Sequence, residues 1–333
     1  MVNIDIGIDL GTSNTVVYIR DKGVVVNQPS VVAYEARSKK VVAVGTQAKQ
    51  MLGRTPEGIE VVCPITKGVI SDYTLTERML KIYVKSAIEQ RRIWGRPNVC
   101  VCVPSAVTEV EARAVEDAVF RTGAKNVYVV EEPFAAAIGA GVNIDTPYGY
   151  MIVDIGGGTT DIAIVSEGGI GYSRSIKAAG NDFDAAIIRY MRKRHNVLLG
   201  DVSAEMLKLE IGSVYPREQD AVGYAKGKEL VRGLPAKVPV KSSEIIEAVS
   251  EVTDQIMDAI KNALESAPPE HISDIVENGI ILTGGGSKIF GLEQLIYEKT
   301  GVIARVIDSP ELAVAKGAGK AKAYIREQDN ANE

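Results

Sequence analysis

Two short turns of the same design, one near the N-terminus and one in mid-chain, constrain the fold more than any other feature. The first runs from Asp9 to Thr15 (DLGTSNT) and the second from Asp154 to Asp161 (DIGGGTTD). Each follows one short apolar segment and leads into another, which predicts a β-hairpin. Asp154 follows Asp9 by 145 residues, and a repeat at this distance predicts two halves of a duplicated α/β unit.

The composition of both turns suits an anion. Glycine permits positive φ and lets backbone N–H groups approach a ligand, while Thr, Ser and Asn add donors. Successive N–H groups in a tight turn form a nest that binds phosphate, so two facing nests could grip a di- or triphosphate. Asp9 and Asp154, one at each strand end, suit Mg²⁺, which prefers oxygen ligands and retains waters. Either turn alone is explained equally well as an ordinary hairpin with a glycine turn.

Two further motifs favour a nucleotide. Thr283 to Ser287 (TGGGS) follows an apolar strand, and its glycines allow flat contact with a nucleoside, although such turns are generic. Glu131 and Glu132 precede Pro133, which fits the first turn of a helix, so one explanation is helix capping. The other is that one carboxylate orients the water that attacks a γ-phosphate. The sequence does not say which glutamate points inward.

Charge and cysteine content exclude several classes of protein. The net charge of −5 and the pI of about 5.4 argue against generic nucleic-acid binding. The chain has three cysteines, Cys63, Cys100 and Cys102, an odd number without the spacing of a metal site. We therefore expect free thiols in the core of a protein from a reducing compartment. Neither a signal peptide nor an apolar run of membrane-spanning length appears, and we expect a cytoplasmic protein.

The hydrophobic pattern predicts strand clusters that alternate with helices, as in α/β layers. We expect an antiparallel meander over 3–34, a small inserted subdomain over 35–65, and a polar insertion with short strands over 214–241. Helices are expected over 74–90, 108–123, from 133 onward, and over 182–194, 203–211, 242–266 and 311–324. The apolar face of the helix over 74–90 is expected to consist of Leu75, Met79, Leu80, Ile82 and Tyr83.

Two candidate sites lie outside the turns. Glu205 and Lys208 are three residues apart on one predicted helix face, which alone is best explained as a surface ion pair. Ile93 and Trp94 stand between arginines, the composition of a membrane-interface anchor. The alternative for Trp94 is that it folds back onto its own domain.

Taken in order, these motifs resemble the ATPase superfamily of actin, DnaK-type chaperones and sugar kinases, and most closely the MreB family of bacterial actins. The resemblance runs from about Asn3 to Ala323 and includes Gly68 to Tyr73 (GVISDY) and Ala313 to Gly319 (AVAKGAG). It implies an α/β, actin-like ATPase fold in which duplicated α/β domains and two smaller inserted subdomains surround a nucleotide cleft. The implied subdomains are IA (1–34, 66–145 and 313–333), IB (35–65), IIA (146–181 and 243–312) and IIB (182–242).

The resemblance also implies residue roles, with ATP or ADP and Mg²⁺ as cofactors. It assigns catalysis to Glu132, Thr159 and Asp154, and Mg²⁺ with its waters to Asp9 and Asp154. Ile93 and Trp94 match the apolar membrane pair. Ser13 replaces an alanine common in the family, and the chain starts too close to its first strand for an N-terminal amphipathic helix. The implied nucleotide contacts are Gly11, Thr12, Ser13, Asn14, Gly156, Gly157, Gly158, Thr159, Glu205, Lys208, Gly284, Gly285 and Gly286.

The implied function is a weak ATPase that polymerises into cytoskeletal filaments at the inner face of the cell membrane and sets cell shape. Its implied partners are further copies of itself, anionic lipid, morphogenesis membrane proteins and MreB paralogues, with no nucleic acid. The alternatives are a DnaK-type chaperone ATPase, a small-molecule kinase, and a plasmid-segregating or soluble actin-like filament protein. A chaperone would need a peptide-binding domain, and a kinase an acceptor-site insertion.

Overall fold

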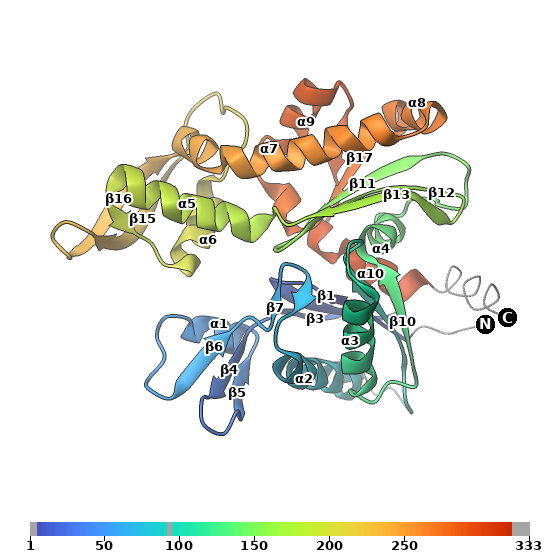
Figure 1. Ribbon diagram of the computed structural model, residues 1–333, viewed down its shortest axis with the longest axis horizontal. Coiled ribbons are helices and arrows are strands. Elements are labelled where there is room, and N and C mark those ends of the chain that lie inside the picture. The colour runs from blue at the N-terminus through green and yellow to red at the C-terminus, as the bar shows by residue number, and fades with distance from the viewer. Residues whose placement is uncertain (1–4, 92–94, 322–333) are drawn as a thin grey trace.

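The computed structural model describes residues 5–91 and 95–321, and it is built from two similar halves (Figure 1). The first half holds a five-stranded sheet in the order β10-β9-β1-β2-β3, and the second a five-stranded sheet in the order β13-β12-β11-β17-β18. The strands of the first sheet are β1 (Ile6–Leu10), β2 (Asn14–Ile19), β3 (Gly23–Pro29), β9 (Asn98–Val103) and β10 (Asn126–Glu131). Those of the second are β11 (Tyr150–Ile155), β12 (Thr160–Ser166), β13 (Gly169–Ile176), β17 (Ile280–Thr283) and β18 (Ala304–Val306).

The two sheets share one topology. In the first, β1, β2 and β3 form an antiparallel meander, and β9 and β10 add in parallel on the other side of β1. In the second, β11, β12 and β13 form the meander, and β17 and β18 add in parallel. The predicted duplication is therefore confirmed. The predicted meander over 3–34 is too long, because its last strand leaves for a separate small sheet.

Helices α4 (Glu132–Gly139) and α10 (Ala313–Lys320) lie between the two sheets (Figure 1). They approach so closely that a Cβ placed on Gly139 would lie 1.9 Å from the carbonyl oxygen of Ala313. A Cβ on Gly317 would lie 1.7 Å from the carbonyl oxygen of Ala135. Small residues on both helices thus make a backbone-to-backbone contact where the two halves join.

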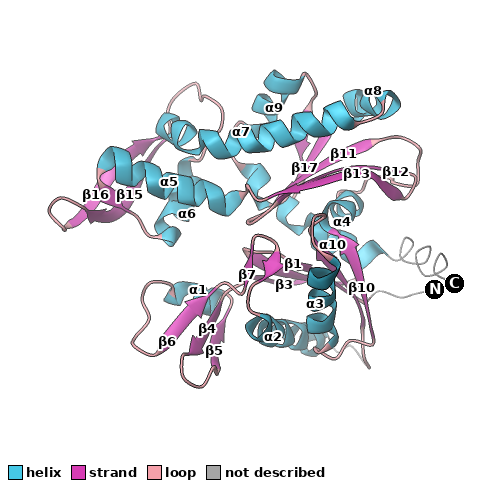
Figure 2. Cartoon of the chain, viewed as in Figure 1, coloured by secondary structure: helices cyan, strands magenta, loops and turns pink. Residues whose placement is uncertain are grey.

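Each half carries a smaller sheet at its outer end (Figure 2). The first small sheet contains β4 (Val32–Glu35), β5 (Val41–Val44) and β6 (Ile59–Val62), with helix α1 (Thr46–Met51) beside it. The second contains β14 (Val197–Leu198), β15 (Val222–Glu229) and β16 (Pro235–Lys241), with α5 (Gly180–His195) and α6 (Asp201–Ile211). A separate hairpin, β7 (Ile65–Thr66) and β8 (Val69–Ile70), follows the first small sheet in the chain.

The remaining helices cover the outer faces. They are α2 (Tyr73–Arg91), α3 (Glu109–Phe120), α7 (Ser242–Ser266), α8 (Pro269–Asn278) and α9 (Leu292–Thr300), with short 3₁₀ turns at Gly285–Lys288 and Pro310–Leu312. Helix α3 begins with the predicted capping box, in which Thr108 and Glu111 bond each other's backbone N–H. None of the helices within 5–91 and 95–321 combines the length and hydrophobicity needed to cross a bilayer.

Two burial predictions are wrong. Leu75, Met79, Leu80 and Tyr83 of α2 are buried, but Ile82 is 42% exposed because it falls on the far side of the helix. Cys100 and Cys102 are buried in β9 as expected, whereas Cys63 is exposed in the loop before β7.

The last predicted helix begins later than expected, at Ala313, after the 3₁₀ turn.

Candidate nucleotide site

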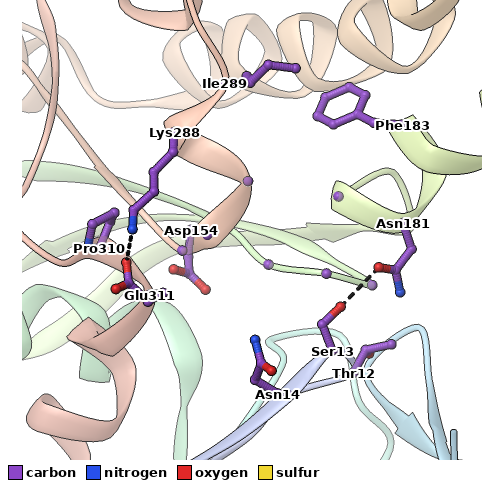
Figure 3. Close-up of a pocket in the computed structure, with 18 of the residues that line it drawn as sticks. Thr12, Ser13, Asn14, Asp154, Asn181, Phe183, Lys288, Ile289, Pro310 and Glu311 are labelled. Atoms are coloured by element: carbon purple, nitrogen blue, oxygen red, sulfur yellow. Dashed lines mark hydrogen bonds and ion pairs between the residues drawn. The ribbon is translucent and has the colours of Figure 1, made fainter. Parts of the chain in front are cut away.

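A cavity of about 580 Å³ lies between the two halves and is lined by residues of both (Figure 3). This volume is typical of small-molecule and cofactor sites. The structure brings together here every described residue that the sequence suggested for nucleotide, metal or catalysis. They are Asp9, Gly11 to Asn14, Glu132, Asp154, Gly156 to Thr159, Glu205, Lys208 and Gly284 to Gly286.

The two predicted phosphate turns touch one another at one end of this cavity. Both are hairpin turns, between β1 and β2 and between β11 and β12. A Cβ on Gly157 would lie 1.9 Å from Ser13 Oγ, and one on Gly158 would lie 2.4 Å from Thr12 Oγ1. Ser13 Oγ also donates to Asn181 Oδ1 at 3.0 Å across the cleft (Figure 3). The glycines are thus required by close approach of the two halves.

Gly157→Ala is expected to force the halves apart and weaken nucleotide affinity. Rotation of the Ser13 hydroxyl does not relieve the clash, because Ser13 Cβ itself would lie 2.7 Å from the new methyl group. The expected loss of nucleotide-binding free energy is about 1–3 kcal/mol, the range typical when a methyl group is forced into a tightly packed contact. Titration with a fluorescent ATP analogue measures it. Gly169→Ala, in β13 and outside the cavity, is the matched control, since its Cβ would meet only the Ser166 carbonyl oxygen, at 3.9 Å; equal losses in both variants would contradict the close-approach argument.

Three carboxyl groups face the cavity beside the turns. Burial and the nearby Asp154 charge raise the pKa of Asp9 to about 8. Burial raises the pKa of Asp154 to about 7, although its Oδ1 accepts the Thr283 hydroxyl at 2.6 Å. Burial and the charges of Asp161, Asp9 and Asp154 raise the pKa of Glu132 well above its usual value. Buried acids that repel one another in this way fit a site completed by a cation.

The donor set fits Mg²⁺ held through waters and phosphate better than a protein cage. Within the described ranges, His, Cys, Asp and Glu side chains nowhere form a group of three placed to ligate a metal. Mg²⁺ commonly keeps several waters and takes one or two carboxylates together with substrate phosphates. Asp9 and Asp154, at the ends of β1 and β11, are the carboxylates that the cavity offers for this.

The structure resolves the choice between the two adjacent glutamates. Glu132 begins α4, is 7% exposed and lines the cavity. Glu131 ends β10 as the N-cap of the helix and is not among the lining residues. Thr159, also 7% exposed, lines the cavity at the second turn.

At the other end of the cavity, Glu205 and Lys208 of α6 have separate partners. Lys208 Nζ donates to the Gly180 carbonyl oxygen at 2.8 Å and pairs with Asp184 Oδ2 at 2.9 Å. Glu205 Oε2 lies 2.6 Å from Nζ of Lys49, on α1 of the opposite half. The alternative of a Glu205–Lys208 surface pair is therefore wrong, and Glu205 instead links the two small sheets across the mouth of the cleft.

Several lining residues at this end were not identified from the sequence. The Arg217 guanidinium carbon lies 3.8 Å from the centre of the Phe290 ring. Figure 3 shows a second contact, in which Lys288 Nζ lies 2.5 Å from Glu311 Oε2. Phe183, Leu209 and Ile289 add apolar surface. An apolar wall with a stacked guanidinium suits a planar base. Lys288, Ile289 and Phe290 are the three residues after the TGGGS turn, and this position is the signal that could have found them.

The predicted membrane residues, Ile93 and Trp94, lie outside the described residues. The neighbouring Arg96 is described, and its Nη2 donates to the Ala124 carbonyl oxygen at 2.7 Å.

Comparison with known sequences identifies the family. The sequence model of the MreB/Mbl protein family matches residues 3–330. The cell shape-determining protein MreB of Escherichia coli K12 is 44% identical over 329 residues, covering 98% of this chain and 95% of that protein. The cell shape-determining protein Mbl of Bacillus subtilis is 43% identical over 315 residues, covering 95% and 94%.

Solved structures identify the fold. MreB 5 of Spiroplasma citri bound to AMPPNP superposes with a TM-score of 0.90 at 34% identity, over 98% of both chains. A chain of the MamK double helical filament has the same fold, with a TM-score of 0.82 at 24% identity over 96% of this chain and 98% of that one. The actin-like fold is therefore confirmed, and the chain belongs to the MreB/Mbl family.

Proposed function

We propose that this chain, divided into the four subdomains named above, binds Mg-ATP between its halves, hydrolyses it slowly, and polymerises into filaments at the inner face of the cell membrane that set cell shape. The observation that carries the proposal is the cavity in which two glycine turns meet beside the Glu132 carboxyl group. Relatives named cell shape-determining proteins, and a relative of known structure bound to AMPPNP, support it.

In the proposed reaction, backbone N–H groups of Gly11 to Asn14 and of Gly156 to Thr159 hold the phosphates. Mg²⁺, when bound near Asp9 and Asp154, supplies neutralisation of the charge that develops on the phosphate oxygens. Glu132 accepts a proton from a water whose oxygen bonds to the γ-phosphorus. The bond from that phosphorus to the β,γ-bridging oxygen breaks, and its electron pair stays on ADP. Glu132 then returns the proton to the phosphate, and Thr159 positions the water.

The distribution of charge supports head-to-tail assembly. On the outward face of β15 and β16, the register puts Lys226 opposite Lys237 and Lys228 opposite Pro235, and these lysines are exposed. At the other end of the long axis, α8 presents exposed Glu270 and Glu277 (Figure 1). A contact between unlike ends of successive copies is heterologous and generates open filaments. Lysines at one end and glutamates at the other suit such a contact.

Association with anionic lipid would rest on Ile93 and Trp94, and many weak contacts along a filament would add through avidity. Morphogenesis membrane proteins and MreB paralogues are further proposed partners. The competing proposal is a filament that does not use lipid, as in plasmid segregation. It differs in one observable property, the binding of vesicles by assembled protein.

Co-sedimentation tests the proposal. With Mg-ATP, the native chain is expected to pellet with phosphatidylglycerol vesicles, and Trp94→Ala is expected to lower that binding at least about tenfold, since a tryptophan ring buries a large apolar area. Electron microscopy of the same samples reports filaments. Filaments that ignore vesicles would favour the lipid-free alternative, and absence of both filaments and lipid binding would reopen the kinase alternative.

A further inference from the structure

One ion pair differs from the other charges of the nucleotide cavity. Lys288 Nζ lies 2.5 Å from Glu311 Oε2, and both residues line the cavity (Figure 3). Among the described residues, no other ion pair has both members in the cavity wall, because Lys208 and Glu205 pair with residues outside it. The pair therefore presents an ammonium group and a carboxylate, side by side, to a ligand at this end of the cavity.

The pair lies against the TGGGS turn, which the sequence suggested for the nucleoside. Gly284 N–H donates to the Pro310 carbonyl oxygen at 3.0 Å, so the turn is bonded to the segment that carries Glu311. A Cβ on Gly285 would lie 3.9 Å from Glu311 Cβ, and Lys288 ends the 3₁₀ turn that begins at Gly285. A nucleoside lying flat on these glycines would have the pair at the edge of its base.

Both members of the pair are able to bond a ligand. Burial raises the pKa of the Glu311 carboxyl, but its bonds to Lys288 and to its own backbone N–H outweigh this and lower the pKa, so the group is ionised at neutral pH. The side chains of Lys288 and Glu311 are 52% and 33% exposed. An ammonium group has three donors, and each carboxylate oxygen has two lone pairs. The contact between the two side chains therefore leaves donors on one and acceptors on the other.

An acceptor beside a donor matches one edge of adenine. Adenine presents its N6 amino group, a donor, next to N7, an acceptor. Guanine presents O6 and N7 along the same edge, and both are acceptors. The Glu311 carboxylate can accept from N6 while Lys288 donates to N7. With guanine in the same place, O6 would face the carboxylate oxygens and be repelled.

We propose that Lys288 and Glu311 recognise the edge of the base and make this chain select adenine nucleotides over guanine nucleotides. The proposal rests on the proposed function, since it concerns the nucleotide that the same cavity binds. The apolar wall of Phe183, Leu209 and Ile289 contacts the faces of a base, and faces do not distinguish one purine from another. Discrimination therefore depends on polar groups at the edge.

The first test uses the native chain and compares ligands. Competition against a fluorescent ATP analogue measures the affinities for Mg-ADP, Mg-GDP and the Mg²⁺ complex of inosine diphosphate. We expect ADP to bind about tenfold more tightly than GDP, within the range for one matched pair of hydrogen bonds. Inosine diphosphate has O6 but lacks the 2-amino group of guanine, so it should bind as weakly as GDP. 7-Deaza-ADP, which lacks N7, should bind more weakly than ADP.

The second test changes one side chain at a time. Glu311→Gln keeps the shape of the side chain, but its amide can either accept from N6 or donate to O6, so the preference for ADP over GDP should almost vanish. Lys288→Met keeps an unbranched side chain and removes the donor to N7, so this variant should bind ADP and 7-deaza-ADP equally. Glu89→Gln is the matched control. It makes the same change in the exposed Lys85–Glu89 pair on α2 and should leave the native preference unaltered.

Each outcome decides the matter. Equal affinity of the native chain for ADP and GDP overturns the proposal, and so does a Glu311→Gln variant that keeps the native preference. Inosine diphosphate that binds as tightly as ADP also overturns it, because the 2-amino group would then be the feature recognised. A native chain that binds none of these nucleotides overturns the proposed nucleotide site itself, which is a different failure. Equal melting temperatures exclude misfolding of the variants, and the ligand comparison needs no variant.

Discussion

Glu132→Gln should lower ATP cleavage by about 10² to 10⁴-fold, the usual contribution of a general base. The glutamine keeps the shape of a side chain that is 7% exposed, so nucleotide binding should persist. Loss of the carboxylate leaves the attacking water without a proton acceptor. The measurement is single-turnover cleavage of ATP by acid quenching, together with affinity for a fluorescent ATP analogue.

Glu131→Gln is the matched control for this substitution. It makes the same chemical change one residue earlier, at the helix N-cap, where the side chain does not line the cavity. Cleavage by this variant should remain near the native rate. If the two variants lose activity equally, or if Glu132→Gln keeps the native rate, Glu132 does not accept the proton.

Without nucleotide and Mg²⁺, the folded chain should become less stable as pH rises from about 4 to 8. The folded pKa is about 8 for Asp9 and about 7 for Asp154, against an ordinary value of 3.8. In this window the folded state holds more protons than the unfolded state, so the free energy of unfolding falls with rising pH. Each unit of pKa difference is worth up to about 1.4 kcal/mol. Urea unfolding in a chelator, over that pH range, measures the slope.

Asp9→Asn supplies the control for this pH dependence. The amide cannot ionise, so the variant should be more stable than the native chain at pH 8 and should show a shallower slope. Addition of Mg-ATP should flatten the native slope as well, because a cation favours the charged carboxylates. A native chain that gains stability between pH 5 and 8 in chelator would contradict the expected repulsion between Asp9 and Asp154.

Local patterns predicted the scaffold well, because the information lies within a few residues. The two hairpins, the Thr108 capping box and the long α7 follow from alternation, cap residues and helical periodicity. Helix α8 has no such clear pattern, since Pro268 and Pro269 suggest a break. The second proline instead occupies the first helical turn, where it needs no N–H partner.

The details of the site depend on contacts between distant residues, which no local pattern contains. Glu205 pairs with Lys49, 156 residues earlier in the chain. Which of Glu131 and Glu132 lines the cavity depends on how α4 is placed relative to β10. Whether Cys63 is exposed depends on which side of a short loop faces solvent. The sequence predicted the role of the glycines in the two turns, because that role depends only on the local turn conformation. Which surface each one touches, as Gly157 touches Ser13, follows only from the assembled halves.

The contact between α4 and α10 limits how the molecule moves. Because the backbones of the two helices meet at Gly139 and Gly317, we expect the halves to move relative to one another by rotation about this junction rather than by sliding of one helix along the other. A small turn at such a pivot produces its largest displacement at the far ends of the two arms. The two small sheets lie at these far ends, and Lys49 on one side pairs with Glu205 on the other. Angular change at the junction therefore becomes linear travel at the surface where another copy would dock.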